Sequence, residues 1–340
     1  MPVDVALETG DRLAEALAVL LAAEPYLPYA SFPPIAERPG PMRACHSRRF
    51  EQAADAEGVL VARDDGRPVA AIALTRRGFE SEHFAMPIAG IDGPLAVADE
   101  AIRLPALRVL YEAARRRLSA AGFVHLAAVA STHDRAASWA LQEAGCFHVG
   151  TRISWMAPLT GERTGPALAA PLRIEVLDRA ALATLRRAHW QRLLDWTGQA
   201  FDRGPFVFDL AVPRERAAAV YRVWTEKAFT GEWADVVLVV RDGDEVVAYN
   251  TMQWLPDLSE AAGVGILGRG IGGSLPGYSG SFTALQRECA AVRPLGASYL
   301  ENETQAATIG SINAFGRLGH RCFRSVASFH GRLGGAARTG

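Results

Sequence analysis

Two segments of the chain share one pattern, in which a short polar cluster separates two apolar runs. Residues 58–74, GVLVARDDGRPVAAIAL, place apolar and β-branched residues on both sides of an Asp-Asp-Gly cluster, which predicts a β-hairpin. Residues 236–251, VVLVVRDGDEVVAYNT, repeat this pattern with a one-residue difference at the turn. We therefore expect the same hairpin twice.

A second pair of segments repeats in the same order. Residues 126–156 and 299–330 each read as an extended segment, a polar break, an apolar-periodic helix and a further extended segment. The helices end at Gly145 and Gly319, and glycine is the usual residue for a left-handed C-terminal cap. The hairpin and the strand–helix–strand segment occur in the same order in both halves, which indicates that a whole folding unit is duplicated.

Each half also carries a helical stretch between these blocks, at 104–122 and 281–296. The order hairpin, strand, helix, strand, helix, strand predicts an α/β (α+β) fold, with a mixed, mostly antiparallel sheet flanked by helices in each half. The segment between the halves is rich in Gly, Pro and Thr, which is typical of a linker. The expected organisation is a first domain at 1–156, a linker at 157–171, a second domain at 172–332 and a tail at 333–340.

Composition narrows the range of partners. The net charge is −1, so no overall basic field favours nucleic acid or an anionic membrane. No apolar run approaches the roughly 18–20 residues of a membrane span, and acidic residues precede the first apolar stretch, unlike a secretory signal. The four cysteines lie far apart, which predicts neither a disulfide framework nor a metal site. We expect a cytoplasmic protein, either a monomer or a homodimer.

The glycine-rich segment 263–281, GVGILGRGIGGSLPGYSGS, is the strongest candidate for a ligand loop. Gly263, Gly265 and Gly268 match a dinucleotide fingerprint, but the further glycines and Pro276 replace the helix that should follow at once. A second interpretation is a loop before a helix that begins near Phe282, whose backbone N–H groups bind the pyrophosphate of coenzyme A. A glycine-rich loop without a ligand is the third.

Residues 301–321, ENETQAATIGSINAFGRLGHR, resemble the last motif of the GNAT superfamily of N-acyltransferases. Within it the chain is most similar to TDP-fucosamine acetyltransferase and related nucleotide-sugar N-acetyltransferases, over most of 57–330. The resemblance implies a bacterial transferase with tandem GNAT-like domains that uses acetyl-CoA or another short acyl-CoA. The acceptor it implies is a small-molecule amine, with an amino sugar or nucleotide amino sugar as the best guess.

The resemblance also implies which residues contact the cofactor. Two segments each match part of the pyrophosphate-binding pattern, and the sequence leaves the choice between them open. The first offers Arg269, Gly270, Gly272 and Gly273, and the second Ser279, Gly280 and Ser281. The remaining cofactor candidates are Ile266, Leu267, Gly268, Thr304, Thr308 and Phe315.

Some positions depart from the family pattern. Thr308 stands where an asparagine is expected, and Phe315 where the family has a tyrosine that is often proposed to protonate the departing thiolate. The first half has no glycine loop at 91–105 and carries Asp134 and Leu141 in its motif. We therefore expect no cofactor in the first half.

Attack of an amine on a thioester requires a neutral amine, so a base within reach helps. Glu301 and Glu303 share one face of a predicted strand and are the candidate catalytic residues, together with His330 by resemblance. The candidate acceptor-binding residues follow the second hairpin: Tyr249, Asn250, Gln253 and Trp254. Acylation of an amine-containing antibiotic or amino-acid-derived metabolite, or a non-catalytic acyl-CoA sensor or scaffold, are the alternatives.

Overall fold

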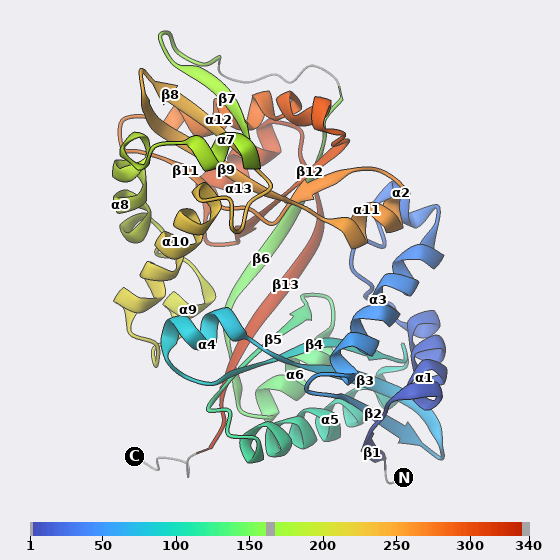
Figure 1. Cartoon of the computed structure of the whole chain (residues 1–340). Coiled ribbons are helices and arrows are strands. Elements are labelled where there is room, and N and C mark those ends of the chain that lie inside the picture. The colour runs from blue at the N-terminus through green and yellow to red at the C-terminus, as the bar shows by residue number, and fades with distance from the viewer. Residues whose placement is uncertain (1–2, 161–166, 335–340) are drawn as a thin grey trace. The chain divides into compact units, whose positions relative to one another are not determined.

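The computed structural model describes residues 3–160 and 167–334, which form two compact units (Figure 1). Unit 1 consists of Met1–Thr151 with Arg324–Gly340, and unit 2 of Arg152–Phe323. Six residues of the expected linker, 161–166, and the end of the expected tail, 335–340, lie outside the described residues. The unit boundaries differ from those expected, because strand pairing rather than chain order decides which unit a segment joins.

Unit 1 is a mixed sheet with helices on both faces. Its strands follow the order β1-β2-β3-β4-β5-β13-β6, and only β4 and β5 pair in parallel among the pairings described. Its elements are β1 (Asp4–Leu7), α1 (Gly10–Ala23), α2 (Pro33–Ala36), α3 (Pro39–Ala54), β2 (Val59–Asp64), β3 (Arg67–Arg76), α4 (Gly78–Phe84), β4 (Ile88–Ala96), α5 (Glu100–Ala120), β5 (His125–Ser131), α6 (Arg135–Glu143) and the first half of β6 (Cys146–Pro158). The last strand, β13 (Arg321–Arg332), pairs with β5 through residues 326–332.

Two cores lie on the two faces of the unit 1 sheet. Leu60 and Ala62 of β2 pack with α5 and α6, whereas Val59 and Val61 pack with α1 and α3. Successive side chains of a strand point to opposite faces, so a sheet covered on both faces buries every position. This explains why the predicted hairpin reads as a nearly continuous apolar run.

Unit 2 repeats this plan. Its strand order is β6-β12-β10-β9-β8-β7, with β11 also paired to β9, and β10 with β12 is the parallel pair. The elements are β7 (Arg173–Asp178), α7 (Arg179–Thr184), η1 (Arg187–His189), α8 (Gln191–Ala200), α9 (Pro205–Phe208), α10 (Arg214–Phe229), β8 (Val236–Asp242), β9 (Glu245–Trp254), α11 (Pro256–Ala262), β10 (Ile266–Gly268), β11 (Gly272–Ser274), α12 (Ser279–Arg287), η2 (Glu288–Leu295), β12 (Tyr299–Gln305) and α13 (Ile309–Arg317).

The predicted duplication of elements is confirmed. Hairpin β2–β3 corresponds to β8–β9, α5 to α12, and α6 to α13. Gly145 and Gly319 follow α6 and α13 with φ of 78° and 76°, so both adopt the left-handed conformation that glycine permits without steric cost. The α/β fold expected from the sequence is therefore the fold observed.

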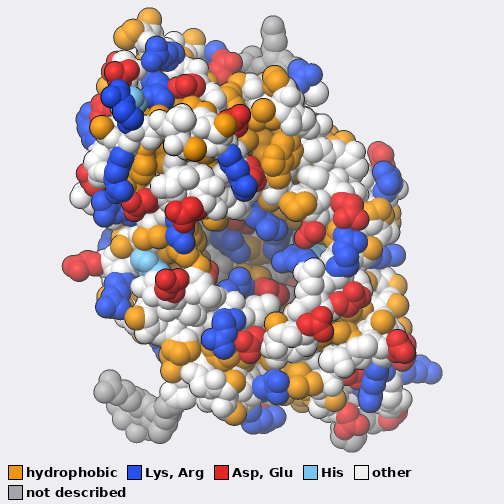
Figure 2. Space-filling view, viewed as in Figure 1, with side chains coloured by type: hydrophobic (Ala, Val, Ile, Leu, Met, Phe, Trp, Pro, Cys, Tyr) orange, Lys and Arg blue, Asp and Glu red, His pale blue; other side chains and the backbone are white. Residues whose placement is uncertain are grey.

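The surface agrees with the composition. Figure 2 shows acidic and basic side chains interspersed over the viewed face, in keeping with the net charge of −1. Among the described residues, no helix combines the length and the apolar character that crossing a bilayer requires.

A buried ion-pair network holds unit 1 together. The guanidinium of Arg103 on α5 is 1% exposed and hydrogen-bonds the carboxylates of Glu24 (3.2 Å) and Asp134 (2.5 Å). It also donates to the carbonyl oxygens of Ala96 (2.7 Å) and Val97 (3.2 Å). Burial raises the pKa of Glu24, and the Arg103 charge opposes that shift. The network links α1, β4, α5 and α6.

Replacing Arg103 with methionine should strongly destabilise the chain. The substitution leaves two buried carboxylates without their cation, and breaking such a pair costs about 3–5 kcal/mol. The matched control is Arg108→Met, which removes the exposed pair between Arg108 and Glu143 and should change the unfolding midpoint little. Urea unfolding checks both variants, and equal midpoints would contradict the prediction.

Candidate functional site

The parallel strands of each unit part after a short paired stretch. In unit 2, β10 and β12 pair only at Ile266–Tyr299 and Leu267–Leu300. The chain then bulges through Arg269, which has φ of 54°, and continues as β11, for which β9 is the described partner. Residues 301–305 of β12 pair with β6 on their other side. The facing edges of β11 and β12 are thereby separated.

Backbone donors on β11 point away from its partner strand. The N–H of Leu275 donates to the carbonyl oxygen of Val247, and the carbonyl oxygen of Ile271 accepts from Thr251. Residues of an antiparallel strand alternate between facing the partner and facing away. Gly272 and Ser274 therefore direct their N–H groups toward the separated edge.

A helix begins shortly after this strand. β11 ends at Ser274 and α12 begins at Ser279, three residues earlier than the start expected near Phe282. The first N–H groups of a helix have no partner within it, and the helix dipole makes this end favourable for anions. Ser279, Gly280 and Ser281 form the first turn, and a Cβ atom at Gly280 would have no neighbour within 4 Å. Ser279 and Gly280 are exposed, whereas Ser281 is 5% exposed and its N–H donates to the carbonyl oxygen of Tyr278 (2.8 Å).

The preceding glycine segment packs within the sheet instead. A Cβ atom on Gly268 would lie 2.7 Å from the Cβ atom of Glu301, and one on Gly270 would overlap the carbonyl oxygen of Thr251. A Cβ atom on Gly272 would lie 2.7 Å from the carbonyl oxygen of Tyr249. These glycines permit close backbone approach within the sheet, whereas residues 279–281 form the first turn of a helix.

The corresponding position in unit 1 is occupied by the protein's own side chains. The N–H of Val97 donates to the carbonyl oxygen of Val69, just as that of Leu275 does to Val247, so Ala96 is the counterpart of Ser274. The outward N–H of Ala96 donates to Glu24 (2.6 Å), and its carbonyl oxygen accepts from Arg103. In unit 1 the Glu24 carboxylate therefore accepts from the N–H group whose counterpart in unit 2, that of Ser274, points to the separated edge.

The two candidate carboxylates lie on β12 as the sequence predicted. Glu303 accepts from Arg152 (3.0 Å) and from the hydroxyl of Ser154 (3.3 Å), both on β6. Glu301 is 3% exposed. Asn302 points to the other face, where its side-chain amide donates to Gln286 of α12 (3.2 Å). Glu301 and Glu303 therefore lie on the face of β12 that looks away from α12.

The other cofactor candidates lie around the parted strands. Ile266 and Leu267 are fully buried in β10, and Thr304 lies near the end of β12. Thr308 is the N-cap residue of α13, but its side chain makes no capping hydrogen bond. Phe315 on α13 is 3% exposed and stacks on His320, with ring centroids 5.1 Å apart.

The candidate acceptor residues on β9 mostly contact other residues of unit 2. Tyr249 is fully buried, its hydroxyl lies 3.0 Å from that of Thr225, and burial raises its pKa to about 12. Gln253 donates to the carbonyl oxygen of Trp233 (2.6 Å). Trp254 is partly buried and packs against the core of unit 2. Asn250 is 4% exposed, and its Nδ2 has no hydrogen-bond partner within the described residues.

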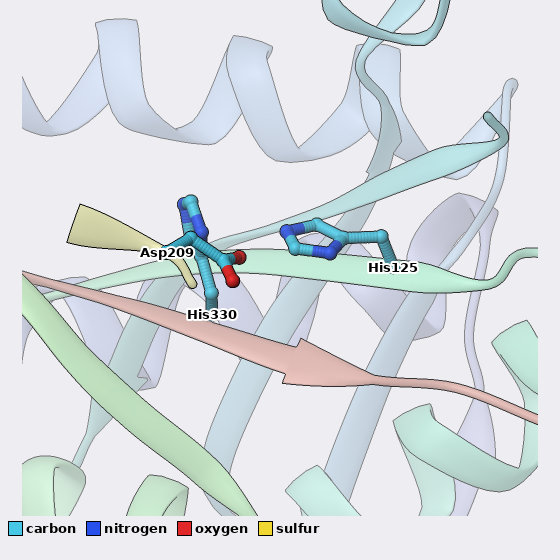
Figure 3. Close-up of side chains that lie close together, drawn as sticks. All are labelled: His125, Asp209 and His330. Atoms are coloured by element: carbon cyan, nitrogen blue, oxygen red, sulfur yellow. The ribbon is translucent and has the colours of Figure 1, made fainter. Parts of the chain in front are cut away.

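His330 belongs to unit 1, whereas Glu301 and Glu303 belong to unit 2. Its imidazole is 2% exposed on β13 and lies beside that of His125 on β5, with ring centroids 4.8 Å apart (Figure 3). The Arg332 side chain lies 3.1 Å from Nδ1 of His125. Within unit 1, His330 is therefore part of a buried pair of imidazoles.

Sequence reasoning missed Arg152, Ser154 and Tyr221, which lie near Glu303. Burial raises the pKa of Tyr221 to about 12, and the charge of nearby Arg152 opposes the shift. Arg152 and Ser154 alternate on β6 and so share a face, but their pairing with β12 joins residues about 150 positions apart. No local pattern reports such a pairing.

Comparison with solved structures identifies the architecture. A GCN5-related N-acetyltransferase from Sphaerobacter thermophilus superposes with a TM-score of 0.57 at 12% identity, covering 97% of this chain and 96% of that one. A tandem GNAT protein from the clavulanic acid biosynthesis pathway gives a TM-score of 0.53 at 12% identity, covering 98% and 100%. The chain has the tandem GNAT fold. No protein-family model and no curated protein matches the sequence.

The contrast between the two glycine segments can be measured. Gly270→Ala places a methyl group against the Thr251 carbonyl and should cost about 2–4 kcal/mol of unfolding free energy. Gly280→Ala enters open space and should leave stability nearly unchanged. Chemical unfolding of both variants tests this, and a tolerated alanine at 270 would contradict it.

Proposed function

We propose that the chain is an acyl-CoA-dependent N-acyltransferase that moves an acetyl or other short acyl group to the amine of a small acceptor. The observation that carries the proposal is the outward edge of β11, which is followed after residues 275–278 by the first turn of α12. An extended amide chain that ends in a pyrophosphate complements such a surface. Coenzyme A has this form.

The residues that would hold the donor follow from the geometry. The N–H groups of Gly272 and Ser274 suit the amides of an extended pantetheine arm, as one strand suits the next. The first turn of α12, at Ser279, Gly280 and Ser281, suits the pyrophosphate. When bound, acyl-CoA would supply an activated thioester.

Glu303 is the proposed base. Its carboxylate accepts hydrogen bonds from Arg152 and Ser154, and a carboxylate is a group that can take a proton from the acceptor's ammonium group. Glu301 is the proposed second carboxylate on the same face. With acyl-CoA bound, the neutral nitrogen would attack the thioester carbon and the C–S bond would break. The nitrogen would release its remaining extra proton to solvent, and the departing thiolate would take a proton from solvent, since Phe315 has none to donate.

An amino sugar or nucleotide amino sugar is the proposed acceptor. Support comes from the resemblance to nucleotide-sugar N-acetyltransferases along residues 57–330. His330 stays a prediction from the same resemblance. A non-catalytic acyl-CoA sensor is the second candidate, and the absence of a tyrosine at Phe315 is the observation that favours it.

Acetyl-CoA should raise the unfolding midpoint and bind at one equivalent per chain. A ligand at 100 times its Kd stabilises a native protein by about 2.7 kcal/mol. Unit 1 should add no second site, because Glu24 and Arg103 already occupy its strand edge. Calorimetric titration gives the stoichiometry, and two equivalents would contradict the assignment of unit 1.

Gly280→Asp should abolish this stabilisation, because a carboxylate in the first turn of α12 repels the pyrophosphate. The matched control is Gly78→Asp, which places the same side chain in the first turn of α4 in unit 1, where a Cβ atom likewise has no neighbour within 4 Å. Differential scanning fluorimetry with acetyl-CoA compares the two. An unchanged shift in the Gly280 variant would refute the proposed pyrophosphate site.

Glu303→Gln should lower kcat about 10²-fold or more while acetyl-CoA still stabilises the variant, since general-base catalysis contributes about 10²–10⁴-fold. Glu143→Gln, which also removes a carboxylate paired with an arginine, is the control and should keep full activity. Thiol release from acetyl-CoA in the presence of glucosamine is the assay. Binding without thiol release for any amine would favour the sensor.

A further inference from the structure

Four large aromatic side chains of unit 2 lie outside its core. Trp196 is on α8, Phe201 follows that helix, and Tyr221 and Trp224 are on α10. All four are partly exposed, whereas Trp190, which stacks on Phe229, is 3% exposed.

These aromatic rings form a continuous wall. Trp196 and Phe201 have centroids 6.3 Å apart, Phe201 stacks on Tyr221 at 4.8 Å, and Tyr221 meets Trp224 edge-on at 5.5 Å. Stacked and edge-to-face contacts of this kind fix ring orientation. We call Trp196, Phe201, Tyr221 and Trp224 the aromatic wall.

Glycines hold the aromatic wall against the backbone. A Cβ atom on Gly273 of β11 would lie 2.8 Å from Cη2 of Trp196, so the indole rests on this strand. A Cβ atom on Gly204 would overlap the Tyr221 hydroxyl. The aromatic wall therefore begins at β11, next to the strand edge assigned to the acyl donor.

Glu303 looks to the same face of the sheet as the aromatic wall. Tyr249 of β9 contacts Thr197 on α8, and Gln253 shares the Tyr249 face because strand positions alternate. Gln253 pairs with Gly268. A Cβ atom built on Gly268 would lie 2.7 Å from Cβ of Glu301, so Gly268 and Glu301 face the same side of the sheet. Glu301 and Glu303 therefore point to the α8 and α10 side, where Arg152 is close to Tyr221.

A donor and an acceptor without partners complete this face. Within the described part of the chain, Nε of Arg152 and Oε1 of Gln305 are buried and have no hydrogen-bond partner. The two residues lie directly opposite each other in the β6–β12 register. A hydroxyl group both donates and accepts, so one hydroxyl complements both atoms.

We propose that the aromatic wall and the polar pair Arg152–Gln305 form the acceptor site, and that it selects a primary amine carried on a hydroxylated ring, as in a hexosamine. This inference rests on the proposed acyl transfer and assigns its acceptor specificity. The C–H face of the sugar ring lies on Trp196 and Tyr221, its hydroxyls bond the polar pair, and its amine reaches Glu303. A linear amine lacks the first two contacts.

Steady-state kinetics with three probes tests the selection. Glucosamine has the amine, the ring and the hydroxyls, cyclohexylamine lacks the hydroxyls, and 1,4-diaminobutane lacks the ring as well. We expect kcat/KM for glucosamine to exceed that of each other probe by at least about tenfold, as a site built around hydrogen bonds rejects analogues without them. Equal kcat/KM for all three would overturn the inference.

Two variants locate the site. Trp196→Ala should raise KM for glucosamine about tenfold with kcat within about threefold, because it removes binding common to ground and transition states. Gln305→Met should raise KM for glucosamine but not for cyclohexylamine. Trp139→Ala is the matched control, since Trp139 is 62% exposed on α6 of unit 1 and should leave KM unchanged.

Two further measurements separate this inference from the proposed function. The acetyl-CoA shift in unfolding midpoint should be the same in wild type and in Trp196→Ala, which also shows that the variant folds. Calorimetric titration of the chain with glucosamine alone tests the acceptor site when no acetyl-CoA binds. Glucosamine binding that is lost in Trp196→Ala supports the site even then, and binding that is absent, or unchanged in the variant, overturns it.

Discussion

The parting of two parallel strands is the constraint on which the rest of this protein depends. A pair of strands that separates exposes backbone N–H and C=O groups along two edges, and such groups need partners when they lie inside a protein. Both units contain this arrangement, because the duplicated order of elements produces one parallel pair in each. The two units differ in what satisfies the exposed groups.

In unit 1, side chains of the same unit bond the backbone groups at the separated strand edge. Glu24, at the end of α1, accepts from the outward N–H of Ala96, and Arg103 bonds the carbonyl oxygen of the same residue. In unit 2 the counterpart of Arg103, the fourth residue of α12, is Phe282, which packs beside Gly272 and brings no charge. One arginine and one glutamate thus make the difference between a closed structural site and an open helix terminus.

The same sheet geometry decides where an acceptor can bind. Helices cover both faces of unit 2, so the middle of β9 is buried and its tyrosine hydroxyl is used by threonines of α8 and α10. Side chains at the ends of β6 and β12, with aromatic rings from α8 and α10, are the ones that stay partly exposed. The residues suited to a small acceptor therefore come from four elements that are distant in sequence.

The sequence by itself determined the duplicated order of hairpin, strand and helix, the glycine caps at Gly145 and Gly319, and the shared face of Glu301 and Glu303, because these features depend on local periodicity and backbone conformation. Only the tertiary structure showed that the two glycine segments have different surroundings, since a glycine that faces a neighbouring carbonyl and one that faces open space look alike in sequence. It also decided which residues hydrogen-bond Glu303 and which side chains bond the separated strand edge of unit 1. Those contacts join residues about 80–150 positions apart through strand pairing and side-chain packing, for which the local pattern carries no signal.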